Sequence, residues 1–299
     1  MSPTERESSS STSSPSAGEP FVLEYSVESG RPLGTGVRKI SSRLIIQSER
    51  RMAFLEKHRS QSDRAGEPIG TFRDELPESL LARVLDRAVK TVVPELPLAR
   101  GGGPGSTVIT LKFEQGTRKV ERIFNTGDMA ILAVMAGLLT ELDQIGNQLS
   151  SHPVCALKAS VEYKSGPTPG FLLTLTNIGR ERICFADPRY LPSDDPDCWA
   201  GAKVAELPEE KPGVTSPPLK WTRVPLERPV ERSAGAAPDS MVVLKPGESF
   251  SARTITWQGK RPGTRYLAIG VYSDYTGPGE LDKIYRVRGA TFSEGLEFE

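Results

Sequence analysis

The chain has 299 residues, long enough for two domains of ordinary size. Its 38 basic and 38 acidic side chains balance. This balance argues against a dedicated nucleic-acid binder, because such proteins gain affinity by neutralising phosphates. Apolar residues make up 37% of the chain, which is enough to build a hydrophobic core.

Residues 1–20 are rich in serine and carry no large apolar side chain after Met1. A segment of this composition cannot offset its ordering entropy, so it is predicted to be a disordered tail without the apolar run of a secretory leader. The nearly apolar run Met129–Leu139 is too short to span a bilayer, which needs about 20 residues. These features predict a cytoplasmic protein with no membrane partner, and its three cysteines are expected to be reduced thiols.

Residues 21–152 are predicted to form an α+β domain. Apolar and polar side chains alternate in three early segments, which predicts strands over 21–27, 42–48 and 51–57. A helical spacing of apolar residues begins after Pro77, and a second begins near Asp128 and ends before His152. Between the helices, a hairpin is predicted around Gln115-Gly116. The expected layout is a mostly antiparallel sheet covered by two helices.

Residues 153–299 show no sustained helical period. Short strand candidates recur instead, separated by turn signals such as Lys245-Pro-Gly-Glu. Such punctuation is typical of an immunoglobulin-like β-sandwich. All three tryptophans, Trp199, Trp221 and Trp257, lie in this half, and one or two of them are expected to fill its core. The predicted fold class is therefore α+β, with an antiparallel sheet and two helices followed by an all-β sandwich.

Two long irregular segments, 187–200 and 227–240, interrupt the predicted sandwich and are candidate binding loops. The first gathers acidic residues and one tryptophan, and we predict that these contact a partner: Asp187, Asp194, Asp195, Asp197 and Trp199. Oxygen ligands at short spacing can bind Ca²⁺, but the spacing and closing Glu of an EF-hand are absent. Interleaved prolines favour a stiff solvated loop, and no metal is predicted.

Sequence motifs for catalysis are missing. The two histidines, His58 and His152, are too few for a His-based metal site, and the cysteines show no CxxC pairing. His152 and Cys155 are separated by an odd number of residues, which would place them on opposite faces of a strand. No GxSxG, HExxH, Walker A or GxGxxG motif occurs. The chain is predicted not to be an enzyme and to need no cofactor.

The stretch of residues 31–64 is locally basic, and we interpret it as the polar face of a sheet.

Two resemblances bear on function. The layout of residues 21–150, with its Leu76-Pro77 helix start, Val93-Pro-Glu-Leu-Pro segment, hairpin and closing Leu-rich helix, resembles emfourin-type inhibitors of thermolysin-like metalloproteases. The Leu244-Lys-Pro-Gly-Glu-Ser-Phe stretch and Pro262-Gly-Thr-Arg-Tyr are similar to immunoglobulin-like modules of bacterial intracellular proteinase inhibitors. The segment Glu28-Ser-Gly-Arg-Pro departs from the emfourin pattern, and no inhibitory residue is carried over.

The leading hypothesis is a non-enzymatic intracellular binding protein, either a proteinase inhibitor or a toxin-neutralising immunity protein. Its expected partner is another protein, a protease or a toxin, and the chain itself is expected to be a monomer or small oligomer. One alternative is a scaffolding component that uses exposed β-edges. A second alternative is a hydrolase whose site has no recognised motif.

Overall fold

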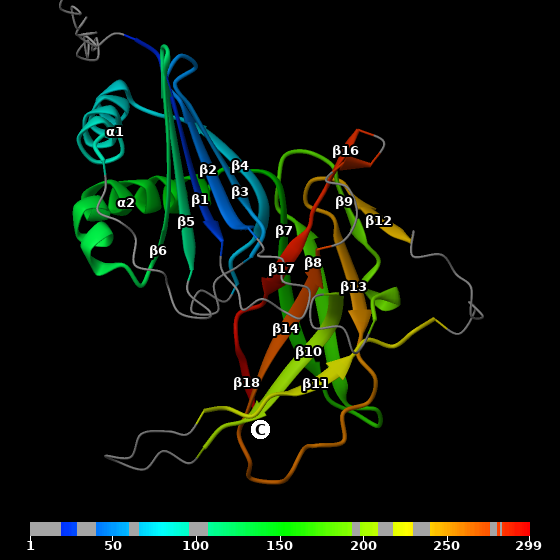
Figure 1. Ribbon diagram of the computed structural model, residues 1–299. Coiled ribbons are helices and arrows are strands. Elements are labelled where there is room, and N and C mark those ends of the chain that lie inside the picture. Colours follow the sequence, from blue (N-terminus) through cyan, green and yellow to red (C-terminus); the bar gives the residue numbers. More distant parts are fainter. Residues whose placement is uncertain are drawn as a thin grey trace, which may run out of the picture.

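The computed structural model describes most of the chain: residues 19–28, 40–59, 66–95, 107–192, 198–208, 218–229, 240–275, 280–281 and 283–299. The fold class predicted from sequence, α+β with a β-rich second half, is confirmed (Figure 1). The predicted tail, the glycine-rich segment 101–105 and much of both predicted binding loops lie outside the described residues.

The described residues of the N-terminal half form six strands and two helices. They are β1 (Phe21–Glu28), β2 (Ile40–Gln47), β3 (Met52–Lys57), β4 (Ile69–Glu75), α1 (Glu78–Thr91), β5 (Val108–Gln115), β6 (Arg118–Asn125) and α2 (Met129–Leu149). Pro77 precedes α1 as its N-cap, and the Asp128 carboxylate accepts a hydrogen bond from the Ile131 amide at the start of α2. The predicted hairpin is confirmed, with Gly116 at φ +55° in its turn.

The C-terminal half is built from short strands and one 3₁₀ turn, η1 (Pro188–Tyr190). Its longer strands are β7 (Pro153–Lys164), β8 (Gly170–Asn177), β10 (Cys198–Glu206), β13 (Ser249–Arg253) and β14 (Tyr266–Asp274). The shorter ones are β9 (Ile183–Ala186), β11 (Thr222–Pro225), β12 (Met241–Leu244), β15 (Glu280–Leu281), β16 (Ile284–Arg286), β17 (Gly289–Phe292) and β18 (Leu296–Phe298).

One sheet of nine strands runs through both halves, in the order β13-β8-β7-β4-β3-β2-β1-β5-β6. The two halves meet where β4 pairs with β7, and a bulge between Thr71 and Phe72 shifts the register there. Two smaller sheets, β11-β10-β14-β17 with β18 on β14, and β12-β9-β16-β15, complete the C-terminal half. The boundary predicted at residue 153 therefore lies between strands that belong to one sheet.

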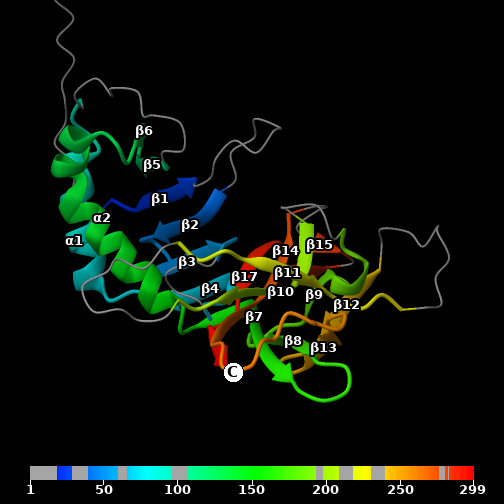
Figure 2. The same cartoon turned by 90° about the horizontal axis from the view of Figure 1, so that it is seen from below.

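The structure buries three clusters of apolar side chains. Both helices cover the same face of the N-terminal strands (Figure 2), and the first cluster, which includes Leu23, Phe72 and Met135, lies between the helices and the sheet. The second cluster, with Ile69, Leu175 and Tyr272, fills the C-terminal half. The third is aromatic and lies at the far end of that half. Ile69 and Phe72 thus belong to different cores, so β4 is covered on both faces.

Helix α2 has the length and composition of a helix that could cross a membrane. In this fold one side of it packs on the sheet. Its buried residues are Ile131, Met135, Leu138, Glu141, Leu142, Ile145 and Leu149.

The carboxylate of Glu141 links α2 to α1. Its side chain is 6% exposed, with Arg83 Nε 2.9 Å from Oε1 and Arg87 Nε 3.0 Å from Oε2. We expect Glu141→Gln to lower the free energy of unfolding by about 1–2 kcal/mol, because Arg83 then loses a charged hydrogen-bond acceptor and Arg87 loses its ion-pair partner. Urea unfolding measures the effect. The control is Asp86→Asn, which removes the exposed pair with Lys90 and should change stability by less than about 0.5 kcal/mol. Equal stability of the two variants would contradict the assigned role of Glu141.

Candidate binding site

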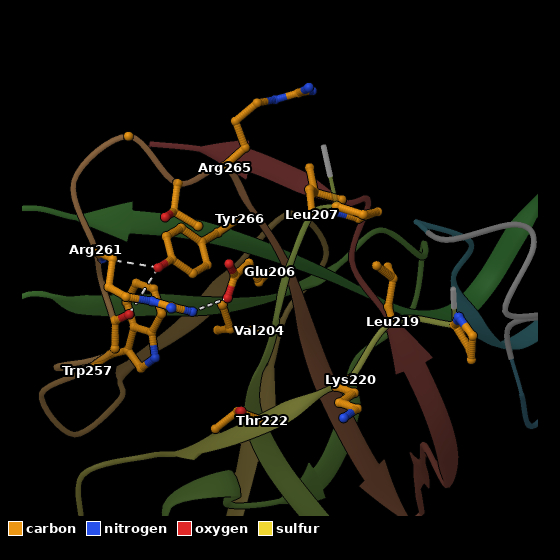
Figure 3. A pocket seen from close by; sticks show the side chains of 15 residues that line it. Val204, Glu206, Leu207, Leu219, Lys220, Thr222, Trp257, Arg261, Arg265 and Tyr266 are labelled. Atoms are coloured by element: carbon orange, nitrogen blue, oxygen red, sulfur yellow. Dashed lines mark hydrogen bonds and ion pairs between the residues drawn. The ribbon is translucent and has the colours of Figure 1, made fainter. Parts of the chain in front are cut away.

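A cleft of about 1050 Å³ opens at the end of the C-terminal half, beyond the ends of β10 and β14 (Figure 3). We call it the basal cleft. Three chain segments line it: Val204, Glu206, Leu207 and Pro208 at the end of β10; Pro218, Leu219, Lys220 and Thr222 leading into β11; and Trp257, Gly259, Arg261, Gly263, Thr264, Arg265 and Tyr266 before and at the start of β14. Its volume is in the range of clefts that accommodate a ligand or a short peptide segment.

The floor of the basal cleft rests on a cluster of aromatic rings. Trp257 and Tyr266 meet edge to face, with their ring centroids 5.0 Å apart. Trp257 also lies 5.7 Å from Phe171 and 5.6 Å from Phe298, again between ring centroids. Rings packed in tilted and edge-to-face arrangements form a stiff platform, since each of them has few rotatable bonds.

Backbone hydrogen bonds fix the segment that carries Trp257. The Trp257 amide donates to the Pro169 carbonyl at 2.7 Å. The Tyr266 hydroxyl donates to the Gly259 carbonyl at 3.1 Å and accepts from the Arg261 amide at 3.0 Å. A Cβ at Gly259 would lie 2.8 Å from Trp257 Nε1, so only glycine lets the backbone approach the indole this closely. The segment from Trp257 to Tyr266 and the aromatic floor are therefore held together by these contacts.

The rim of the basal cleft is charged. Arg261 forms an ion pair with Glu206 (Figure 3). Arg265 pairs with Glu297 at 2.8 Å. In the part of the chain that the structure describes, Lys220 has no acidic partner within ion-pair distance. Among the described rim residues there is therefore one cation in excess, above an aromatic floor. This combination suits a ligand that has both an apolar group and a carboxylate.

The lining residues include no Cys, His, Ser or Asp. The one carboxylate, Glu206, is already paired with Arg261. Among the described lining residues there is neither a Ser, Cys or His nucleophile with a base nor a pair of free carboxylates.

The structure describes one of the four aspartates predicted to contact a partner. The Asp187 carboxylate accepts hydrogen bonds from the Arg189 amide and guanidinium, at 3.0 Å to Oδ1 and 2.6 Å to Oδ2, and so begins η1. Asp194, Asp195 and Asp197 lie outside the described residues. Within the described ranges, no group of three His, Cys, Asp or Glu side chains could hold a metal ion.

Trp199 lies in strand β10, where the sequence predicted a loop. The side chain is 3% exposed, and its Nε1 has no hydrogen-bond partner. The Arg223 guanidinium stacks 5.3 Å from the indole centroid, and Lys203 lies opposite Arg223 across β10 and β11. Burial, together with the nearby cations Arg223 and Arg59, lowers the pKa of Lys203. Trp199 therefore supports a basic surface from below and does not itself form part of that surface.

The structure separates His152 from Cys155. His152 Nδ1 lies 3.4 Å from an Asp74 carboxylate oxygen, whereas Cys155 is buried in β7, where it pairs with Thr71 of β4. Burial raises the pKa of the Cys155 thiol, which makes it a poor nucleophile. His58 lies near the junction of the two halves, between a Glu56 carboxylate oxygen and the Arg288 carbonyl, each 3.3 Å away. Its hydrogen bond to Glu56 is one reason why the pKa of that carboxyl is lowered.

Sequence reasoning did not identify the basal cleft. Its lining comes from three segments far apart in the chain, and none of them carries a motif. The one available signal was Trp257, one of three tryptophans of which one or two were expected in the core, beside the polar and glycine-containing turn 258–264. No protein-family model and no curated protein matches the chain.

Proposed function

We propose that this chain is a non-enzymatic binding protein that holds a segment of another protein in the basal cleft. The single observation that carries the proposal is the composition of the cleft: a fixed aromatic floor and a cationic rim, without reactive groups in the lining. A proteinase inhibitor or an immunity protein is the form of binding protein we favour. The resemblances of the two halves to emfourin-type and immunoglobulin-like inhibitor modules support that choice.

The charge and shape of the basal cleft define what it should bind. An apolar side chain of the partner would contact the exposed margin of the Trp257–Tyr266 cluster, whose two residues are 8% and 3% exposed and are held in place before binding. An acidic side chain beside it would meet Lys220 at the rim. Pairing at a solvent-exposed rim contributes mainly to specificity and to the rate of association.

Selection from a random peptide library tests the binding proposal. We expect the full chain to enrich peptides with an aromatic or aliphatic residue next to Asp or Glu. We expect Lys220→Glu to weaken the selected peptides about tenfold, equivalent to about 1.4 kcal/mol. Lys245→Glu, which reverses an exposed charge in a distant turn, is the matched control and should leave binding unchanged. The measurement is peptide affinity by fluorescence anisotropy.

An inhibition assay tests the narrower form. Titration of a panel of thermolysin-like metalloproteases with the chain should give stoichiometric inhibition of at least one of them, and this inhibition should weaken in the Lys220→Glu variant. If the chain binds peptides but inhibits no protease of the panel, the binding proposal stands and the proposal of a metalloprotease inhibitor is rejected. Selected peptides that bind wild type and Lys220→Glu equally well would place binding elsewhere and overturn the assignment of the cleft.

A further inference from the structure

Strand β6 forms an edge of the nine-stranded sheet and pairs only with β5 among the described strands (Figure 1). It is eight residues long and contains no proline. Three of its side chains are well exposed: Lys119 at 71% and Glu121 at 53% of their side chains, and Ile123 at 61%. A regular edge of this length can pair with another strand.

The register of the β5–β6 hairpin fixes which backbone groups of β6 point outward. Gln115 pairs with Arg118 across a two-residue turn, which makes them a hydrogen-bonded pair. Even-numbered residues of β6 therefore bond to β5, in agreement with the Thr126 amide, which donates to the Thr107 carbonyl at 3.0 Å. The amides and carbonyls of Lys119, Glu121 and Ile123 then point away from the sheet, where an added strand would lie.

A row of alternating charges crosses the open face of the sheet toward this edge. Arg43 on β2 contacts Glu24 on β1 at 2.7 Å, and Glu24 lies 3.9 Å from Lys112 on β5. Lys112 in turn lies 3.5 Å from Glu121 on β6. The row thus ends with a negative charge at the sheet edge. Two residues before Glu121, on the same face, is Lys119, which pairs with Glu114 at 3.3 Å.

We propose that two copies of this chain pair antiparallel along β6, about a twofold axis at Val120. In this register Lys119 of each copy lies opposite Glu121 of the other. Both residues have outward backbone groups, so each such pair can exchange two hydrogen bonds. The alternation of charge then continues without a break, from Glu121 to Lys119 of the second copy and on to Glu114 of that copy.

Neighbouring registers lack this complementarity. An antiparallel twofold pair keeps side chains on matching faces only when the axis passes through a residue. Centring it at Lys119 or at Glu121 places two like charges opposite each other, and centring it at Arg122 or Ile123 leaves Lys119 and Glu121 without opposite charges. Charged residues at a sheet edge usually prevent pairing, and here the order of Lys119 and Glu121 favours one register. On the other face this register places Arg118 of each copy opposite Arg122 of the other, where the Arg122 guanidinium donates hydrogen bonds to the carbonyls of residues 92–94.

A charge-exchange experiment tests this proposal. We expect the full chain to form a concentration-dependent dimer in sedimentation velocity and native mass spectrometry. Lys119→Glu and Glu121→Lys should each be monomeric, because each one places like charges opposite each other in both symmetry-related pairs. An equimolar mixture of the two variants should recover a mixed dimer, because the two acidic side chains that one variant carries at these positions then face the two lysines of the other.

Lys90→Glu reverses an exposed charge on α1 and is the control, for which we expect the wild-type dimer. Circular dichroism of each variant shows whether it keeps the fold. A wild-type chain that stays monomeric up to about millimolar concentration would overturn the proposal, as would a dimer that survives both single charge reversals. Failure of the dimer leaves peptide binding at the basal cleft unaffected, so the two proposals fail independently.

Discussion

Gly70→Ala is expected to lower the free energy of unfolding by about 3–5 kcal/mol. Gly70 lies in β4, where the sheet passes from one half of the molecule to the other, and its φ is +133°. An added Cβ would lie 2.0 Å from the Cys155 carbonyl oxygen and 2.8 Å from Ala156 Cα, both on β7. Backbone on both strands would have to move, so the pairing that joins the halves would be lost. Urea unfolding followed by circular dichroism measures the loss.

Gly166→Ala is a matched control for this prediction. Gly166 has a similar φ of +129°, but an added Cβ there meets no atom within 4 Å. It should cost only the backbone strain, about 1–2 kcal/mol. The difference between the two variants isolates the contact with β7. If Gly70→Ala and Gly166→Ala lower the free energy of unfolding equally, backbone strain alone explains both losses. The close approach of β4 to β7 would then not be the reason that position 70 requires glycine.

Asp274→Asn is the second large effect, with an expected loss of about 3–5 kcal/mol. The Asp274 side chain is fully buried, and Arg286, 11% exposed, places Nη2 3.0 Å from its Oδ2. Removal of the carboxylate charge takes away the ion pair of Arg286 in a low-dielectric site. Chemical denaturation measures the loss, and proteolysis should show that the β16 segment becomes the first to be cleaved.

The double variant Asp274→Asn/Arg286→Met tests whether the stability lost in Asp274→Asn comes from breaking a buried ion pair or from disturbed packing. Removal of both charges should recover much of the stability lost in Asp274→Asn, because no uncompensated charge then remains. The exposed pair Arg265–Glu297 provides a reference, since Glu297→Gln should cost less than about 1 kcal/mol. Additive losses in the double variant would contradict the assigned coupling.

Local patterns predicted the elements that have one exposed and one buried face. Strand β1 alternates cleanly, and α1 and α2 repeat their apolar residues at helical spacing, so these elements were predicted from sequence. The burial of Trp199 and Trp257 is consistent with the expectation that one or two tryptophans fill the C-terminal core. These features depend on residues that are close together in the sequence, so the spacing of apolar side chains is enough to predict them.

Two strands that are covered on both faces, β4 and β10, were missed. Strand β10 reads Cys-Trp-Ala-Gly-Ala-Lys, a composition poor in typical strand formers, yet long-range pairing with β11 and β14 holds it extended. In β4 regular alternation places Ile69 on one face and Phe72 on the other, each in a different core, so its buried apolar residues do not recur at every second position. The basal cleft could not be predicted either, because three distant segments assemble it.

The pairing of β4 with β7 has a consequence for the order in which the protein is made. Strand β4 ends at Glu75 and its partner begins at Pro153, so during synthesis the first half must wait for the second to emerge. Until then β4 has an unpaired edge, and Ile69 lacks the core that buries it. A nascent chain that stalls before β7 is therefore at risk of pairing with a neighbouring chain, and chaperone demand should peak at that length.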